Sequence, residues 1–86
     1  MNENGKTDAD LIDKIQSGDQ AAFKELFATY HKSVFRLCLR MLRDSQEAED
    51  MTQDVFLKVF LKIKKFCGAS NVSTWLYRIT VNMCLN

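Results

Sequence analysis

Apolar residues recur at helical spacing through the centre of this 86-residue chain. They follow the i, i+3, i+4, i+7 rule of an amphipathic helix: Phe23, Leu26, Phe27, Tyr30, Val34, Leu37, Cys38 and Met41. A second stripe of Phe35, Leu39 and Leu42 broadens the apolar face near its end. Both stripes are expected in the core of the protein. Because proline is absent and glycine occurs only three times, few residues break a helix, and the chain is predicted to be all-α.

Three further amphipathic stretches complete a small bundle of four helices. Residues 1–7 are polar and are expected to be disordered. Asp19 is expected to cap the second helix, and Asp44 followed by Glu47 resembles a capping box before the third. Gly68 ends the third helix, and Ser70, Asn71 and Ser73 are all able to cap the fourth. The predicted helices span a short 8–17, two long ones at 20–42 and about 45–66, and a final one from 72 to the end.

Composition excludes several classes of protein. No run of about 18 apolar residues exists, so a membrane span is not expected, and the polar N-terminus lacks the apolar core of a signal peptide. A cytosolic protein with reduced thiols is therefore expected. Three cysteines and one histidine fit no zinc pattern, and no nucleophile motif or phosphate-binding glycine loop is present. The sequence therefore predicts no enzyme, metal site or cofactor.

The charges are divided along the chain. All eleven acidic residues lie at or before Asp54, whereas residues 55–86 hold five basic residues and no acid: Lys58, Lys62, Lys64, Lys65 and Arg78. Helix dipoles favour bases near the end of a helix, which explains part of this pattern but not a whole third of the chain. One basic end and one acidic end indicate two partners of opposite character.

The face of the third helix opposite its apolar stripe carries acids beside leucines. At 100° per residue, five side chains project together there: Asp50, Gln53, Asp54, Leu57 and Leu61. Isolated surface leucines need no explanation. Because these two share a face with an acidic cluster, the face is predicted to be a protein-docking surface.

The stretch from Phe66 to Asn82 carries the residues suited to nucleic acid. Thr74, Tyr77, Arg78 and Asn82 form a set able to stack on bases, contact phosphate and hydrogen-bond base edges. Trp75 lies on the apolar face and is interpreted as core. Phe66 is compatible with a core role or with the floor of a base pocket.

Four stretches together resemble region 2 of bacterial RNA polymerase sigma factors of the extracytoplasmic-function group. Gly18–Phe23 is similar to the opening turn of that family, and Ala48–Phe56 to its polymerase-docking helix. Phe66–Ser70 is similar to its Phe-Arg-Gly loop, and Thr74–Asn82 to its promoter-reading helix. The resemblance implies that residues 8–86 form a sigma region 2 domain, without the region 4 that reads the minus-thirty-five element.

The resemblance implies roles by position. Asp50, Gln53 and Asp54 would contact the clamp helices of the largest subunit of the polymerase core, and the face argument adds Leu57 and Leu61. A base flipped out of the minus-ten element would enter a loop pocket floored by Phe66 and formed by Cys67, Gly68, Ala69, Ser70, Asn71 and Val72. Thr74, Arg78 and Asn82 would follow the non-template single strand, and the four lysines would attract its phosphates.

The resemblance also implies transcription initiation in the bacterial cytoplasm, an anti-sigma factor as a further partner, and no membrane contact. The chain departs from the family pattern at Cys67, where arginine is usual, and at Asn71-Val72, where a small residue precedes an aromatic one. A helical adaptor that binds only proteins, through the Leu57 and Leu61 face, is the alternative.

Overall fold

Four α-helices and one short 3-10 helix make up the protein in a computed structural model that describes residues 4–66 and 71–86. The elements are α1 (Asn4–Gln16), α2 (Gln20–Leu42), α3 (Ser45–Lys62), η1 (Ile63–Lys65) and α4 (Val72–Leu85). The described residues contain no strand, so the predicted all-α bundle is confirmed.

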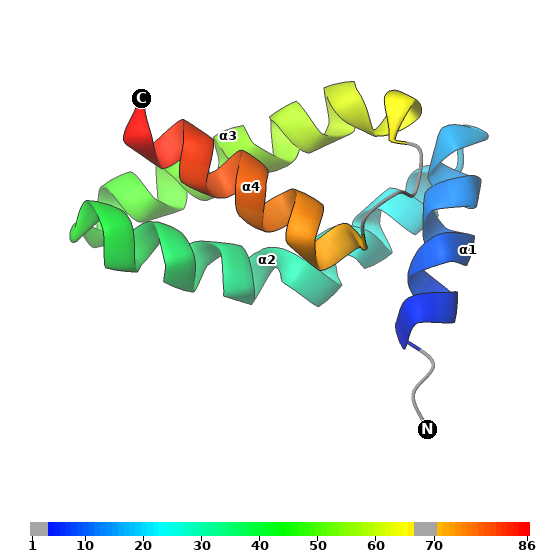
Figure 1. Cartoon of the computed structure of the whole chain (residues 1–86), viewed down its shortest axis with the longest axis horizontal. Helices are drawn as coiled ribbons and strands as arrows, with labels where there is room; N and C mark the ends of the chain where they lie inside the picture. The colour runs from blue at the N-terminus through cyan, green and yellow to red at the C-terminus, as the bar shows by residue number, and fades with distance from the viewer. Residues whose placement is uncertain (1–3, 67–70) are drawn as a thin grey trace.

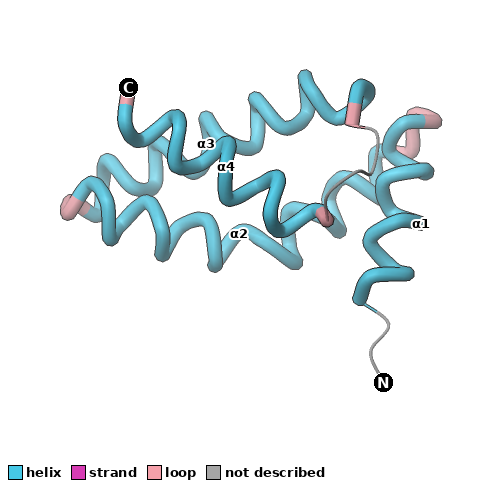
Figure 2. The backbone as a smooth tube through the Cα atoms, viewed as in Figure 1, coloured by secondary structure: helices cyan, strands magenta, loops and turns pink. Residues whose placement is uncertain are grey.

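The helices α2 and α3 form an antiparallel pair, and α4 lies across both (Figure 1). α1 stands at the far end of this pair from the α2–α3 turn and packs on α2 and η1 (Figure 1). The tube in Figure 2 shows short turns between α1 and α2 and between α2 and α3. α2, α3 and α4 each contact the other two, so they share a single core.

Local signals fix the ends of α2. Gly18 adopts φ +99 in the turn after α1, a conformation that only glycine reaches without strain. The Asp19 carboxylate then accepts a hydrogen bond from the Ala22 N–H at 3.2 Å. At the other end Arg43 is left-handed (φ 59), and its N–H donates to the Leu39 carbonyl at 2.8 Å. The predicted bounds of α2 are confirmed.

Two predicted boundaries differ from the structure. α1 begins at Asn4, four residues before the predicted start of the first helix at residue 8. The α-helical part of α3 ends at Lys62 and continues as the tighter η1 to Lys65. Asp44 caps α3 as predicted, because its carboxylate accepts from the Glu47 N–H at 2.9 Å.

The core contains the predicted inner faces of the helices. Its fully buried side chains include Leu26 and Cys38 from α2 and Val55 and Val59 from α3. Two predicted core residues are exposed: Phe27 is 36% exposed and Leu39 is 37% exposed. Periodicity placed them on the apolar face, but they lie at its edge, where cover is incomplete: the Phe27 ring packs edge-on against Phe56 of α3 at 4.8 Å and remains partly open to solvent.

Candidate nucleic-acid interface

The start of α4 is fixed by Asn71. Its Oδ1 accepts from the Thr74 N–H at 2.9 Å, and the Ser73 hydroxyl donates to the same oxygen at 3.4 Å. Of the three side chains able to cap this helix, Asn71 does so. Its side chain therefore satisfies a helix terminus, in addition to any contact it makes with a ligand.

Three expected DNA contacts form a line along α4. Thr74, Arg78 and Asn82 are exposed and are spaced four residues apart, so they lie on one face of the helix. Val72 does not belong to this surface. Its side chain is only 3% exposed and packs in the core, so this side chain offers almost no surface to a base.

Phe66 and Trp75 pack against each other near the start of α4. Their ring centroids lie 4.7 Å apart, at an interplanar angle of 46°. Both side chains are partly buried against the core. The core interpretation of Trp75 is confirmed, and Phe66 is a core contact whose remaining exposure still allows a second role.

Gln16, at the end of α1, anchors this region from a distant part of the chain. Its Nε2 donates to the carbonyl oxygens of Ile63 at 2.8 Å and Phe66 at 2.9 Å. These carbonyls lie at the two ends of the η1 turn, where the Ile63 oxygen also accepts from the Phe66 N–H at 3.1 Å. The sequence offered no signal for this contact, because nothing local relates a glutamine to carbonyl groups about fifty positions away.

The basic residues lie on solvent-exposed positions of α3 and η1. Lys58 and Lys62 belong to α3, and Lys64 and Lys65 belong to η1. All four are exposed. A cluster of exposed ammonium groups attracts phosphate without reading sequence. The remaining predicted pocket residues, Cys67, Gly68, Ala69 and Ser70, lie outside the described residues.

The predicted docking face of α3 is open to solvent. Leu57 is 60% exposed and Leu61 is 68% exposed. Asp50, Gln53 and Asp54 on the same face are also exposed. Sequence reasoning missed Phe60, which is 51% exposed although its ring packs edge-on against Phe23 at 5.2 Å. Phe60 extends this apolar surface from α3 toward α2, and its exposure could not be read from periodicity.

Two cysteines meet where α4 crosses α2. Both thiols are free, and the Cys84 thiol donates to the Cys38 sulfur at 3.9 Å. The expected core position of Cys38 is confirmed. Burial raises the pKa of Cys84 from 9.0 to about 11, and the neighbouring Cys38 adds to the effect. The Cys84 thiol is therefore a weak nucleophile near neutral pH.

Two findings concern metal sites and membrane spans. Over residues 4–66 and 71–86, no group of three or more His, Cys, Asp or Glu side chains is placed to hold a metal ion. None of the helices in that part of the chain has both the length and the apolarity needed to cross a bilayer.

The chain is similar to known proteins over most of its length. The family model described as Sigma-70 region 2 matches residues 26–86. The chain is 38% identical to the RNA polymerase sigma-H factor of Pseudomonas aeruginosa over 79 residues, which cover 92% of this chain and 41% of that protein. It is 37% identical to the ECF RNA polymerase sigma factor SigW of Bacillus subtilis, over 87% of this chain and 40% of the relative.

The ECF RNA polymerase sigma-E factor of Escherichia coli is 39% identical, over 93% of this chain and 41% of that protein. The chain thus spans about two fifths of the length of these curated relatives. Among solved structures, it resembles an engineered region 2 of sigmaE in complex with GTAAAA. The TM-score is 0.86 at 35% identity, covering 100% of this chain and 88% of the other.

Proposed function

This chain belongs to the sigma-70 region 2 family, in the extracytoplasmic-function group, and from that premise we propose that it binds RNA polymerase and captures the unpaired strand of a minus-ten promoter element. It would act in transcription initiation, in the bacterial cytoplasm, without catalysing a reaction itself.

One observation carries the DNA-binding half of the proposal. Thr74, Arg78 and Asn82 form a continuous exposed line that begins at the capped start of α4. An arginine can hold phosphate, and an asparagine amide can read a base edge by two hydrogen bonds. A related domain has been solved in complex with GTAAAA, which supports a single strand of DNA as the ligand.

Capture of an exposed base would supply the free energy of strand opening. A ligand shifts an equilibrium only by its differential affinity for the two states. A pocket formed by residues 67–71 and floored by Phe66 would favour the open state by replacing lost base stacking, which is worth ~1–3 kcal/mol per base. The lysines of α3 and η1 would raise affinity for either state and make it dependent on salt.

The exposed face of α3 is the proposed polymerase contact. Asp50, Gln53 and Asp54 would face the clamp helices of the largest subunit, with Leu57 and Leu61 beside them. On α3 the lysines border this face, since Lys58 follows Asp54 by one helical turn, whereas the line of Thr74, Arg78 and Asn82 lies on α4. An anti-sigma factor would inhibit the protein by covering either surface.

The decisive experiment measures binding of a GTAAAA single strand to the parent and to Asn82→Ala. We expect the variant to lose about tenfold in affinity, since one good base contact is worth ~1–3 kcal/mol. Gln20→Ala removes an exposed amide of α2 that is assigned no contact, so it is the control and should bind as the parent does. Circular dichroism should be unchanged in both variants. Equal affinity of the parent and Asn82→Ala would contradict this assignment.

A second candidate, a helical adaptor without DNA binding, is favoured by the exposed apolar side chains of α3, Leu57, Phe60 and Leu61. A salt titration separates the two functions. Binding of the strand that weakens steeply with salt supports the sigma factor. If the parent binds no single strand while it still binds a polymerase fragment, the adaptor is correct.

A further inference from the structure

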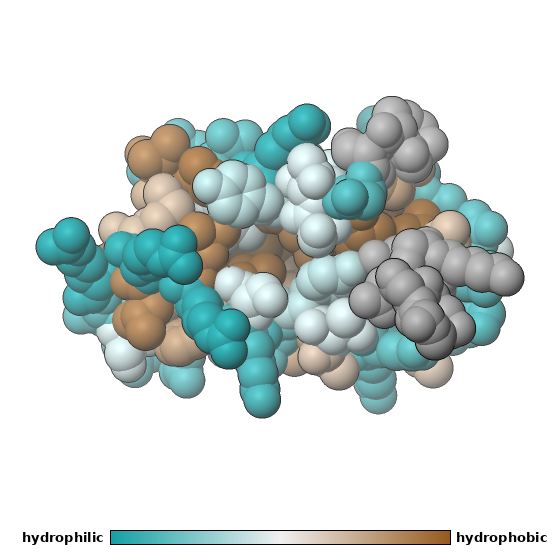
Figure 3. Space-filling view, turned by 60° about the horizontal axis from the view of Figure 1, so that its bottom comes forward, coloured by the Kyte–Doolittle hydropathy of each residue, from teal (hydrophilic) through white to brown (hydrophobic). Residues whose placement is uncertain are grey.

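A groove of about 320 Å³ lies between α2 and α4. Its apolar floor is formed by Val34, Leu37 and Leu76, and its rims by Tyr30, Ser33, Arg36, Arg40, Ser73, Tyr77 and Thr80. Among the described residues that line it, Tyr77 alone belongs to the set that the sequence suggested for nucleic acid, and none is a proposed polymerase contact. Figure 3 shows the molecule turned so that the lower side of Figure 1 comes forward. A band of weakly polar side chains crosses the middle, with apolar side chains visible between them.

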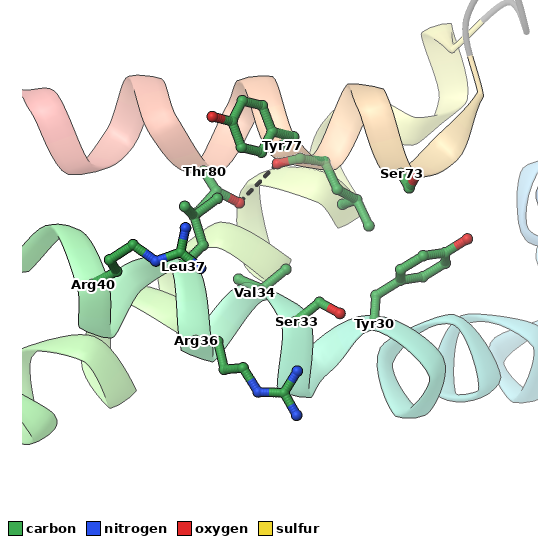
Figure 4. A pocket seen from close by; sticks show the side chains of 10 residues that line it. Tyr30, Ser33, Val34, Arg36, Leu37, Arg40, Ser73, Tyr77 and Thr80 are labelled. Carbon is green, nitrogen blue, oxygen red and sulfur yellow. Dashed lines mark hydrogen bonds between the residues drawn. The ribbon is translucent and has the colours of Figure 1, made fainter.

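The groove is positive at one end. Arg40 reaches toward the gap between α2 and α4, whereas Arg36 points away from α4 (Figure 4). The described residues that line the groove include no acid. A guanidinium held there without a carboxylate beside it is suited to phosphate, which it can contact through two parallel hydrogen bonds.

The rim offers aromatic surface. Tyr77 is 58% exposed and stands on α4 above the groove, and Tyr30 lies at the opposite end, near Ser73 (Figure 4). The Thr80 hydroxyl does not face a ligand, because it donates to the Leu76 carbonyl at 2.7 Å (Figure 4). An exposed tyrosine ring over an apolar floor is a surface on which a base can stack.

The position of the groove connects it to the proposed DNA site. Ser73 lines the groove and also donates to Asn71, the cap of α4. The groove therefore starts at the same end of α4 as the line of Thr74, Arg78 and Asn82, but on the side that faces α2. A strand held at this end of α4 is within reach of both.

We propose that this groove is a second nucleotide site, which binds one further unpaired nucleotide of the same DNA strand. Arg40 holds the phosphate and Tyr77 stacks on the base. The size of the groove suits a single nucleotide, and its uncompensated cation distinguishes it from a site for an apolar protein segment. This inference rests on the proposed function, since it needs a strand bound at α4.

The test uses Arg40→Gln, Tyr77→Leu and Tyr77→Phe, with Lys32→Gln as the matched control. Lys32 is an exposed cation of α2 that lines a different depression, between α2 and α3. The probes are GTAAAA and the same strand lengthened by a few nucleotides at either end. Binding is measured by fluorescence anisotropy over a range of salt concentrations.

We expect at least one lengthened strand to bind the parent more tightly than GTAAAA. Arg40→Gln should lose that gain, and the slope of log affinity against log salt should fall by about 0.7, the value for one phosphate contact on a single strand. Tyr77→Leu should lose on the order of tenfold, as one stacked base predicts. Tyr77→Phe keeps the ring and should bind like the parent, as should Lys32→Gln.

Three outcomes would overturn the inference, and they differ in their cause. If Arg40→Gln and Tyr77→Leu bind every strand as the parent does while Asn82→Ala is weakened, the proposed function stands and the groove has no role in it. If Arg40→Gln loses affinity for a polymerase fragment but not for DNA, the groove is a protein site. If the parent binds no strand, the proposed function itself fails. Thermal unfolding by circular dichroism verifies that each variant is folded.

Discussion

The Nε2 of Gln16 lies 2.9 Å from the carbonyl oxygen of Phe66, fifty positions further along the chain. The same amide also donates to the Ile63 carbonyl. The end of α1 thus holds the backbone that leaves η1, directly before the segment expected to receive a flipped base. The first helix is therefore part of the support of the candidate site, although no residue of α1 was assigned to it from the sequence.

Replacing Gln16 should lower the stability of the protein. Gln16→Met keeps most of the side-chain volume but removes the donor, so the Phe66 carbonyl loses the amide and the Ile63 carbonyl keeps only the Phe66 N–H. We expect the free energy of unfolding to fall by ~1–3 kcal/mol in a urea titration. Gln20→Met, at an exposed position near the start of α2, is the control and should change it little. Equal stability of the two variants would show that the anchor contributes nothing.

The cap of α4 can be separated from any DNA contact of Asn71. Asn71→Ala should cost ~0.5–2 kcal/mol of stability, because the Thr74 N–H loses its acceptor. Asn71→Ser retains a capping hydroxyl and should be nearly as stable as the parent. If Asn71→Ser is stable but binds GTAAAA more weakly, Asn71 also reads the strand. A stable Asn71→Ala would contradict the capping role.

The acidic face of α3 should be needed for polymerase alone. Asp50→Arg reverses a charge at the proposed contact, and like charges placed together cost several kcal/mol. We expect at least about a tenfold loss of affinity for a fragment that contains the polymerase clamp helices, with unchanged binding of GTAAAA. Glu25→Arg, an exposed reversal on α2, is the control. Full binding by Asp50→Arg would remove α3 from the interface.

The stability of the protein should depend on pH through Cys84. Burial raises the pKa of this thiol in the folded protein from 9.0 to about 11. The folded state therefore favours the neutral thiol, and its contribution to stability is complete below pH 9 and is lost as the pH rises to about 11. The difference in the free energy of unfolding between the parent and Cys84→Ser should shift against the parent across that range. A constant difference in urea titrations would contradict the raised pKa.

Sequence determined the helices and the family. Capping residues and periodicity placed α2 at Gln20–Leu42, because these signals act between residues at most a few positions apart. Four stretches carry the region 2 resemblance in the sequence itself: Gly18–Phe23, Ala48–Phe56, Phe66–Ser70 and Thr74–Asn82. The same local reasoning predicted the exposed line on α4.

Tertiary structure decided which apolar surface is covered and which distant groups meet. Periodicity assigned Phe27 and Leu39 to the core, yet burial depends on how far the neighbouring helix extends over the face. It likewise gave no reason to expect Phe60 at the surface. The burial of Val72, in contrast, agrees with periodicity, because Val72, Trp75, Leu76 and Ile79 follow the i, i+3, i+4, i+7 spacing of one apolar face. The Gln16 anchor, the Cys38–Cys84 contact and the groove between α2 and α4 each join segments far apart in the chain. No local pattern encodes such pairs, because they arise only when the helices pack.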